Sequence, residues 1–330
     1  MNRAIAPDEG PAGVGWFARC DDALRRRATF VWRRLTMAEH RPAVPAAMEW
    51  LANHGRRGGL SPASGDECAC PGLTGAGLET LAGFGQVGLA REWADWLLAI
   101  QLADGAFPDA GLRHASLTNT AHVLRALEVW ADVFSECHGA ARRAAEYLAG
   151  RIDGRGRIAG VDRAGSSFEI WVPRAGYLAC LPPLAAAARR WGVSSWSDAV
   201  NAAEAHWLRA HDPTTWFEPC QVFLSIVEAL IELGQAAEAR HALVGPASAQ
   251  RRDGSVPAGP TVNWTSNAGL ARLASIWFTL GERERAGRAL ACLRRRQLPS
   301  GAFTGSWGRG ACDHPQRESA WAVRNFLDAA

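Results

Sequence analysis

The sequence predicts an all-α fold, an (α/α)6 toroid of six helical hairpins with an extra helix at the N-terminus. Apolar residues recur at helical spacing along most of the chain, without the alternation typical of strands. The helices are of two alternating kinds. One kind starts near residues 71, 118, 172, 219, 263 and 315, at intervals of 47, 54, 47, 44 and 52 residues, which indicates a tandem repeat.

The first kind of helix is apolar on nearly all faces and follows a polar or proline-containing loop. We expect these helices to be buried on most sides, over residues 71–86, 118–134, 172–192, 219–234, 263–281 and 315–330. The second kind is amphipathic and rich in Arg or Glu. It is expected to cover the first kind from outside, over residues 87–101, 138–151, 194–211, 236–250 and 282–297.

Six buried helices need six outer partners, and only five follow them in sequence. The segment 43–54 (AVPAAMEWLANH) is the expected sixth partner, and it would pair with the last buried helix and close a ring. A closed ring needs no capping repeats, unlike an open solenoid. We therefore expect one toroid domain over residues 43–330, preceded by an extension, 1–42, with a packed helix within 15–40.

A short motif recurs where outer helices end: QLADGAF from Gln101, QRRDGSV from Gln250 and QLPSGAF from Gln297. Glycine in the fifth position adopts the positive φ that a tight turn requires. The last residue of each motif, Phe107, Val256 or Phe303, is expected to return and pack. The motif therefore predicts the same hinge in three hairpins.

Composition excludes several classes of protein. The 330 residues are 48% hydrophobic, and 36 basic against 33 acidic residues give a net charge of +3, without the interleaved aromatics of a nucleic-acid surface. No secretory signal and no apolar run of 18 residues is present, so we expect a cytoplasmic protein without a membrane span. Eight cysteines in a chain of this length do not indicate a disulfide framework.

The hinge motif, Q-x-x-[DS]-G-x-[FV], resembles the repeat of the prenyltransferase β-subunit and squalene cyclase superfamily, whose fold is an α/α toroid. Other stretches are similar to six-hairpin-glycosidase-like proteins from bacterial exopolysaccharide and surface-glycan gene sets: DECACPGLTGAGLETL, DGAFPDAG with LTNTAH, VNWTSNAGLARLASIW, and GSWG with ESAWAVRNFLDA. This resemblance implies a glycan ligand. The D-x-D-D motif of class II terpene cyclases and the D-D-x-x-D motif of class I enzymes are absent.

The loops before the buried helices are expected to meet at one end of the ring, its mouth, where binding residues commonly lie. Their carboxylates could supply the acid and base of glycoside chemistry, or each could simply stabilise a helix start. The candidates are Asp66, Glu67, Glu169, Glu218, Asp313 and Glu318. We predict Asp66, Glu67, Glu218 and Asp313 as catalytic. Asp66, Glu67 and Asp313 are favoured among them, since closure of the ring brings the first and last loops together.

Four tryptophans in or beside these loops could stack on a sugar or stabilise a carbocation, or could pack between hairpins. Polar residues in the first turns of apolar helices are costly unless they line a wet site or have partners. The predicted substrate-binding residues are Asn119, His122, Trp171, Tyr177, Trp216, Asn263, Trp264, Asn267, Trp307, His314 and Glu318. A core packing or capping role is the alternative for each.

A second constellation contains zinc-ligand residue types: Cys68, Cys70, Cys312, Asp313 and His314. Protein prenyltransferases of the resembling fold hold zinc with Asp, Cys and His, and Asp66-Glu67-Cys68 reproduces the D-x-C spacing. Asn119 stands where the partner histidine would be expected. We therefore predict no cofactor, with zinc as the alternative.

The sequence predicts an enzyme that processes a glycan or a glycosylated metabolite by carboxylate acid–base chemistry, as a hydrolase, lyase or epimerase. An isoprenoid cyclase or a zinc-assisted prenyltransferase is the second hypothesis. A non-catalytic binding ring in surface-polysaccharide assembly is the third. No nucleic-acid partner is expected.

Overall fold

The computed structural model describes residues 43–56, 58–159, 174–213, 215–217 and 220–330. The chain divides after Arg41 into two units, and every described residue belongs to the second unit, Pro42–Ala330. The helix expected within residues 15–40 lies outside the described residues.

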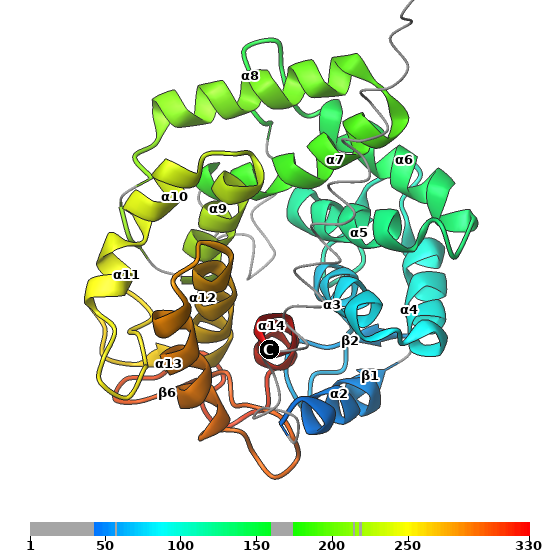
Figure 1. Cartoon of the computed structure of the whole chain (residues 1–330). Coiled ribbons are helices and arrows are strands. Elements are labelled where there is room, and N and C mark those ends of the chain that lie inside the picture. Colours follow the sequence, from blue (N-terminus) through cyan, green and yellow to red (C-terminus); the bar gives the residue numbers. More distant parts are fainter. Residues whose placement is uncertain (1–42, 57, 160–173, 214, 218–219) are drawn as a thin grey trace, which may run out of the picture. The chain divides into compact units, whose positions relative to one another are not determined.

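Within this unit, the helices form two concentric layers (Figure 1). The inner layer contains α3 (Pro71–Phe84), α5 (Leu117–Trp130), α7 (Leu181–Trp191), α9 (Cys220–Glu232), α12 (Asn267–Thr279) and α14 (Ala320–Ala329). The outer layer contains α2 (Ala43–His54), α4 (Val87–Ile100), α6 (Glu136–Ala149), α8 (Ser194–Ala210), α10 (Ala236–Ala242), α11 (Val244–Ser248) and α13 (Arg283–Arg294). The prediction of an all-α toroid with 43–54 as an outer helix is confirmed.

Three inner helices share one start signal. Ser116, Ser266 and Ser319 are extended, and each side chain accepts a hydrogen bond from a backbone N–H of the first turn. A serine in this position satisfies an amide that the helix itself leaves without a partner. For this reason α12 and α14 begin at Asn267 and Ala320, four and five residues later than the expected starts at 263 and 315.

Prolines account for two other differences from the expected helices. A helix was expected from residue 172. The structure describes a 3₁₀ helix there, η2 (Arg174–Cys180), and α7 starts only at Leu181, which two prolines follow directly. The helix expected over 236–250 is split at Leu243 into α10 and α11, because Pro246 fits only in the first turn of a new helix.

Three antiparallel pairs of two-residue strands accompany the helices. β1 (Gly55–Arg56) pairs with β2 (Gly59–Leu60), β3 (Phe107–Pro108) with β4 (Ala115–Ser116), and β5 (Thr265–Ser266) with β6 (Ser306–Trp307). The sequence did not predict these strands, because two residues are too few to show an alternating pattern. The strands β4 and β5 lead directly into α5 and α12 and so fix where these inner helices start.

The recurring glutamine motif is a clamp between neighbouring hairpins. Gln101 Nε2 donates to the carbonyl of Gly105 in its own turn, at 3.0 Å, and to that of Ala140 in the next outer helix, at 2.9 Å. Gln250 donates in the same way to the carbonyls of Gly254 and Arg285. Gln297 donates to those of Gly301 and Ala43. Each clamp therefore ties the end of one outer helix to the start of the next.

The hinge glycines make a contact that no other residue could make. Gly105, Gly254 and Gly301 have φ of +88°, +88° and +89°, and a Cβ there would lie 2.0 to 2.4 Å from a backbone oxygen of the next outer helix. Gly156 makes the same approach to Ala202 in α8, at 2.1 Å, with φ +76°. Its turn lacks the glutamine, which is why the motif did not reveal this fourth hinge.

The ring closes between its first and last hairpins. The amide of Ser64 donates to Glu318 O at 2.8 Å, and that of Ala320 donates to Pro62 O at 3.0 Å. Helix α14 contacts α2, α3 and α12. We call the segments 61–66 and 317–320 the seam.

The last residues of the three hinge motifs belong to the core: Phe107 and Phe303 are fully buried and Val256 nearly so. The prediction that these three hinge residues return to pack is confirmed. No helix within the described ranges combines the length and apolarity needed to cross a bilayer.

Candidate functional site

The loops that precede the inner helices form the mouth, and backbone hydrogen bonds hold several of them together. Besides the seam, β5 pairs with β6, the amide of Asn267 donates to Gly305 O at 2.9 Å, and that of Ala258 donates to Trp264 O at 2.9 Å. The loop before α14 thus contacts both the loop before α3 and the loop before α12. These contacts bring first and last mouth loops together, as ring closure requires.

Two of the predicted mouth carboxylates stabilise the seam. Asp66 accepts from the Arg317 guanidinium and, at 3.0 Å, from the amide of Ala63. Glu318 accepts from the indole N–H of Trp50 at 2.8 Å and from the Ser300 hydroxyl. Because both carboxylates are engaged by donors from their own fold, their geometry fits a structural role.

Asp313 differs from these two carboxylates. Its backbone oxygen accepts from the Ser306 hydroxyl at 2.7 Å, but its carboxyl receives no hydrogen bond from any described residue. Burial raises the pKa of Asp313, and His314 alone opposes that shift. Glu67 is exposed and forms no hydrogen bond or ion pair with the described residues. Asp313 and Glu67 therefore remain available for chemistry, one half-buried and one in solvent.

The backbone is strained at two places in the mouth. Leu112 and His314 are the only non-glycine residues with positive φ among those the structure describes, at +56° and +43°. Leu112 lies in the loop between β3 and β4, and His314 directly follows Asp313. Strain of this kind is concentrated at functional sites, and both outliers lie in mouth loops.

Trp307 is held rigidly at the mouth. Its indole N–H donates to Asn267 Oδ1 at 3.1 Å, and Asn267 Nδ2 donates to Thr304 O at 2.9 Å. The guanidinium of Arg296 lies 3.2 Å from the centroid of the Trp307 ring. One face of this predicted sugar-stacking tryptophan is therefore covered by a cation, and Asn267 acts as its positioning partner.

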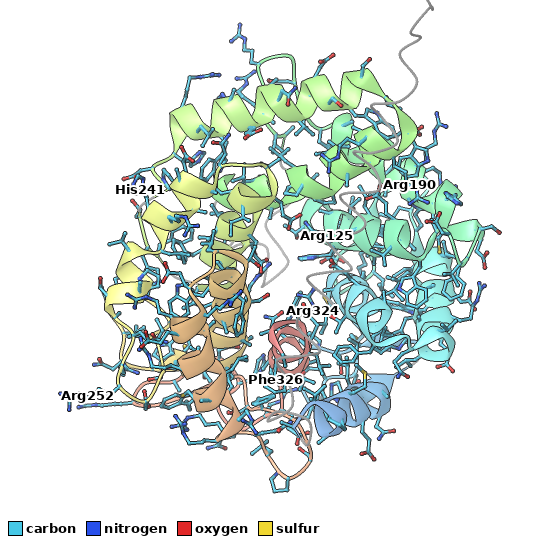
Figure 2. All side chains as sticks on the ribbon, viewed as in Figure 1. Arg125, Arg190, His241, Arg252, Arg324 and Phe326 are labelled. Carbon is cyan, nitrogen blue, oxygen red and sulfur yellow. The ribbon has the colours of Figure 1, made fainter. Side chains whose placement is uncertain are left out.

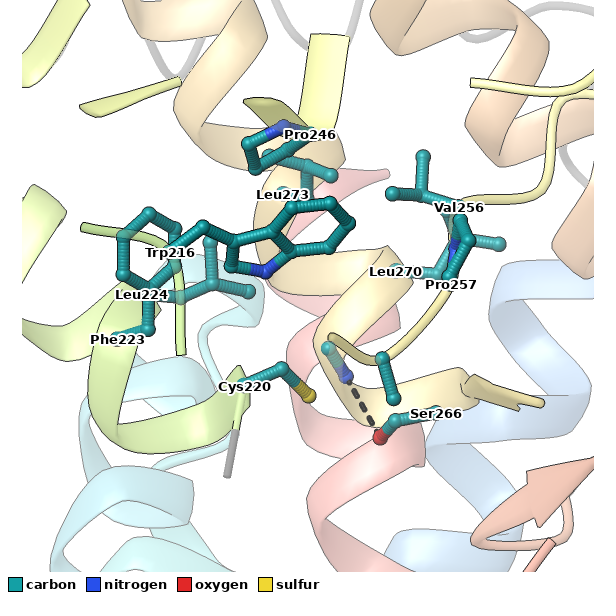
Figure 3. Close-up of a pocket in the computed structure, with 12 residues that line it drawn as sticks. Trp216, Cys220, Phe223, Leu224, Pro246, Val256, Pro257, Ser266, Leu270 and Leu273 are labelled. Atoms are coloured by element: carbon teal, nitrogen blue, oxygen red, sulfur yellow. Dashed lines mark hydrogen bonds between the residues drawn. The ribbon is translucent and has the colours of Figure 1, made fainter. Parts of the chain in front are cut away.

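Trp216 packs between hairpins. It lies over Gly245 at the start of α11 and lines an apolar pocket with Phe223, Leu224, Pro246 and Val256 (Figure 3). The pocket has a cavity volume of about 20 Å³, which accommodates a water molecule but not a sugar ring. The position of Trp216 therefore fits the alternative role, packing between hairpins, and not sugar stacking.

The remaining predicted binding residues are dispersed. Asn119 Nδ2 donates to Pro108 O at 2.8 Å and packs against Gly72, so it joins β3 to two inner helices. Asn263 is exposed, Trp264 is half-buried, and Tyr177 is buried on η2. Glu169, Trp171 and Glu218 lie outside the described residues.

The cysteine and histidine constellation is spread over two loops. Cys68 and Cys312 are exposed, and Cys70 directly precedes α3. In the part of the chain that the structure describes, no three side chains of His, Cys, Asp or Glu gather as a metal-ligand set.

Sequence reasoning missed a group of charged side chains on the inner helices, which we call the central cluster. Its members share one feature, a charge or imidazole on a helix that is otherwise apolar. They are Glu79, His122, Arg125, Glu228, Glu232, Arg272, Arg324 and Asp328. Only His122 was predicted to bind substrate, although charged residues on otherwise apolar helices could have been recognised in the sequence as candidates for the ring interior.

Ion pairs connect the central cluster. Arg272 donates through Nε and Nη2 to Glu228, at 2.7 and 2.5 Å. Arg324 reaches Asp328 at 2.9 Å and Glu79 at 3.5 Å. The paired carboxylates keep 24 to 31% of their side-chain surface exposed, so solvent reaches the cluster.

Other contacts cross the ring interior. Arg125 Nη1 donates to Glu232 at 2.7 Å, from α5 to α9, although η2 and α7 lie between these helices in the ring order. His122 and Trp321 lie with ring centroids 5.9 Å apart, from α5 to α14, with α3 between them. Figure 2 shows Arg125 and Arg324 extending into the space that the inner helices surround, whereas Arg190 and Arg252 point outward.

His122 is uncharged at neutral pH. Burial lowers the pKa of its imidazole, the charges of Arg272, Arg324 and Arg125 lower it in the same direction, and together they bring it to about 3. Within the described residues, no carboxylate counters the effect of these arginines on the imidazole. The neutral ring offers one donor and one acceptor, and no described residue takes either.

No protein-family model and no curated protein matches this chain. Several solved structures are similar to this chain. An α-amylase from Clostridium perfringens is similar with a TM-score of 0.67 at 12% identity, over 87% of this chain and 96% of that one. An unsaturated glucuronyl hydrolase specific for heparin has a TM-score of 0.64 at 13% identity, over 87% and 93%.

A type II terpene cyclase from Scytonema, in complex with geranylgeranyl dihydroxybenzoate, has a TM-score of 0.61 at 15% identity, over 87% of this chain and 95% of that one. The chain therefore has the toroid fold that glycosidases and a terpene cyclase share. The predicted resemblance to the six-hairpin glycosidase and squalene cyclase repeat superfamily is confirmed at the level of fold.

Proposed function

We propose that this protein is an enzyme that processes a glycan or a glycosylated metabolite at the mouth of the toroid. The observation that carries the proposal is Asp313, a half-buried carboxyl that accepts no hydrogen bond from the described residues and whose pKa is raised by burial. A general acid for glycoside chemistry must hold its proton near neutral pH, and burial is the usual means.

The second carboxylate that the chemistry needs is supplied by Glu67 in this proposal. The seam joins the loop that carries Glu67 to the loop that carries Asp313. Exposure keeps Glu67 in contact with water, which suits a base that activates a water molecule or abstracts a proton. Asp66, although adjacent, is held by Arg317 and serves the proposal as a support of the seam.

Glycosidases among the structural neighbours support the sugar-directed version of the proposal. The neighbouring terpene cyclase supports an isoprenoid alternative, but the central cluster disfavours it, because an apolar chain that entered the ring would have to displace water from charged groups. Asp313 and Glu67 suit hydrolysis, elimination and epimerisation equally, since all three use a carboxyl acid with a base.

The test is turnover of a panel of neutral and uronate-containing aryl glycosides and polysaccharides. Release of the aryl group or a reducing end reports hydrolysis, and ultraviolet absorbance of a new sugar double bond reports elimination. We expect Asp313→Asn to reduce turnover by about 10²-fold or more, the usual contribution of a general acid. The control is Asp198→Asn, which removes an exposed carboxylate of α8.

Full activity in Asp313→Asn and in Glu67→Gln would contradict the acid–base assignment. Binding of glycans without turnover of any panel member would instead favour the non-catalytic ring.

A further inference from the structure

Three side chains near the centre of the ring carry hydrogen-bond donors that the fold does not use. His122 and Arg125 are three residues apart on α5 and therefore share a face of that helix. Trp321 comes from α14 and meets the His122 ring at 5.9 Å. Neither His122 nor Trp321 forms a hydrogen bond with any residue the structure describes.

Only part of the Arg125 guanidinium has a hydrogen-bond partner among the described residues. Its Nη1 donates to Glu232, and no described residue accepts from its Nε or Nη2. Nε and Nη2 form the side edge of a guanidinium, which matches the two oxygens of a carboxylate. In the same ring, Arg272 uses its Nε and Nη2 to hold Glu228, with both donors on the single oxygen Oε2.

The other two arginines of the cluster are occupied. Arg324 donates to Ala76 O, Thr80 and Asn325 in addition to its two carboxylates. Arg272 donates to Gln221 O and Ser225 beyond its pair with Glu228. Arg125 is therefore the one arginine of the cluster whose carboxylate-binding edge no described residue occupies.

The open donors are within reach of solvent. The side chains of His122, Arg125 and Trp321 are half-buried, and Arg125 keeps 28% of its side-chain surface exposed. An unoccupied guanidinium edge, an imidazole and an indole N–H that contact solvent inside a ring have the properties of a ligand site.

Local charge also favours an anion. Arg125, Arg272 and Arg324 all act on His122, and none of the four carboxylates of the cluster opposes them there. A negative group beside His122 would be stabilised by these guanidinium groups, whereas Glu232, Glu79 and Glu228 partly offset the charge of Arg125.

We propose that Arg125, His122 and Trp321 bind an acidic sugar, with its carboxylate on the Nε and Nη2 edge of Arg125. Trp321 offers an aromatic face to the pyranose ring, and the neutral His122 pairs with a hydroxyl. The inference rests on the proposed function and narrows its substrate class to uronate-containing glycans. No covalent step is involved.

The experiment compares binding of sodium D-glucuronate, D-glucose and sodium acetate at constant ionic strength, by ligand-observed NMR and calorimetry. Glucuronate and glucose differ only in the carboxylate at C6. A charge-assisted pair of hydrogen bonds contributes about 1.5–3 kcal/mol, so we expect glucuronate to bind at least about tenfold more tightly than glucose. Acetate, which lacks the ring, is expected to bind more weakly than glucuronate.

Two variants test the assignment to Arg125. Arg125→Gln removes the edge, and Arg125→Lys keeps a positive charge for Glu232 but has no edge to offer. Both are expected to bind glucuronate and glucose with similar affinity. The control is Arg142→Lys on the exposed face of α6, and thermal unfolding of each variant checks that the ring is intact.

Equal affinity for glucuronate and glucose in the unmodified chain would overturn the inference but leave the proposed function standing. A preference for glucuronate that survives in both Arg125 variants would also overturn it, as would acetate binding as tightly as glucuronate. Loss of turnover in Asp313→Asn is measured separately, so failure of the proposed function is distinguishable from failure of this site.

Discussion

Gln297 and Ala43 are joined by a hydrogen bond, 2.8 Å from the side-chain amide nitrogen to the backbone oxygen, across 254 residues of sequence. The same amide nitrogen donates to Gly301 O at 2.8 Å. One side chain thus ties the end of α13 to its own turn and to the start of α2, where the ring closes.

Replacement of this glutamine is expected to weaken ring closure. Gln297→Ala removes two hydrogen bonds, each with a net contribution of about 0.5–1.5 kcal/mol, so the free energy of unfolding should fall by about 1–3 kcal/mol. Chemical denaturation measures it. Gln316→Ala is the control, since Gln316 is exposed and its side chain forms no hydrogen bond with the described residues. Equal stability of the two variants would contradict the clamp.

A pair of glycine variants separates backbone strain from steric overlap. Gly301 and Gly281 have similar φ, +89° and +84°, but a Cβ at Gly301 would lie 2.2 Å from Ala46 O, whereas nothing lies within 4 Å of one at Gly281. Both alanine variants incur about 1–2 kcal/mol of left-handed strain. Gly301→Ala should be destabilised further or fail to fold, and equal melting temperatures would show that the hinge can move apart.

His122 is expected to titrate far below an ordinary histidine, with a pKa of about 3 because of burial and three arginines. The unfolded chain takes up this proton near pH 6.5 and the folded chain does not. The contribution of His122 to stability is therefore complete above pH 6.5 and declines as the pH falls toward 3. NMR titration of the imidazole measures it directly, and a pKa above 6 would refute the buried, cationic environment.

The variant His122→Gln gives an independent check of that pKa. Its stability should depend less steeply on pH than that of the unmodified chain between pH 3 and 6.5. An unchanged slope would mean that folded and unfolded states bind the proton alike.

Replacement of Asp313 is expected to reduce activity without reducing stability. Burial raises its pKa, so the folded state binds the proton more tightly than the unfolded state, and the contribution to stability is lost as the pH rises through the raised value. Above the raised pKa the charged carboxyl opposes folding. Asp313→Asn should accordingly melt at the same temperature or higher while turnover falls, and a clear loss of stability would assign Asp313 a structural role.

Breaking the Arg272–Glu228 pair should cost less than breaking a fully buried pair. Loss of one partner from a buried ion pair typically costs about 3–5 kcal/mol, but Glu228 retains 30% exposure and can hydrate. We expect Arg272→Met to lower the free energy of unfolding by about 2 kcal/mol and addition of Glu228→Leu to restore part of it. Strict additivity of the two changes would mean that the pair is not coupled.

Much of the ring was predictable because its causes are local. Gln101, Gln250 and Gln297 and the glycines after them repeat in the sequence, and the helical periodicity identified each inner helix. The starts of α12 and α14 were placed too early, since Ser266 and Ser319 are recognisable as caps only when the strand or seam before them is known.

The candidate site was less predictable for a related reason. Asp66 and Asp313 look alike in sequence, and only the position of Arg317, from the other end of the domain, shows that Asp66 is engaged and Asp313 is not. Arg125 could have been singled out as a charge on an apolar helix. Which of its nitrogens is occupied depends on Glu232, 107 residues away.

The hinge glycines also constrain how such a protein can change. Each one fits against the backbone of the following hairpin, and the last fits against the first. Gain or loss of a single hairpin would leave two unmatched edges, so divergence among relatives should be concentrated in the length of the mouth loops, with the number of hairpins conserved.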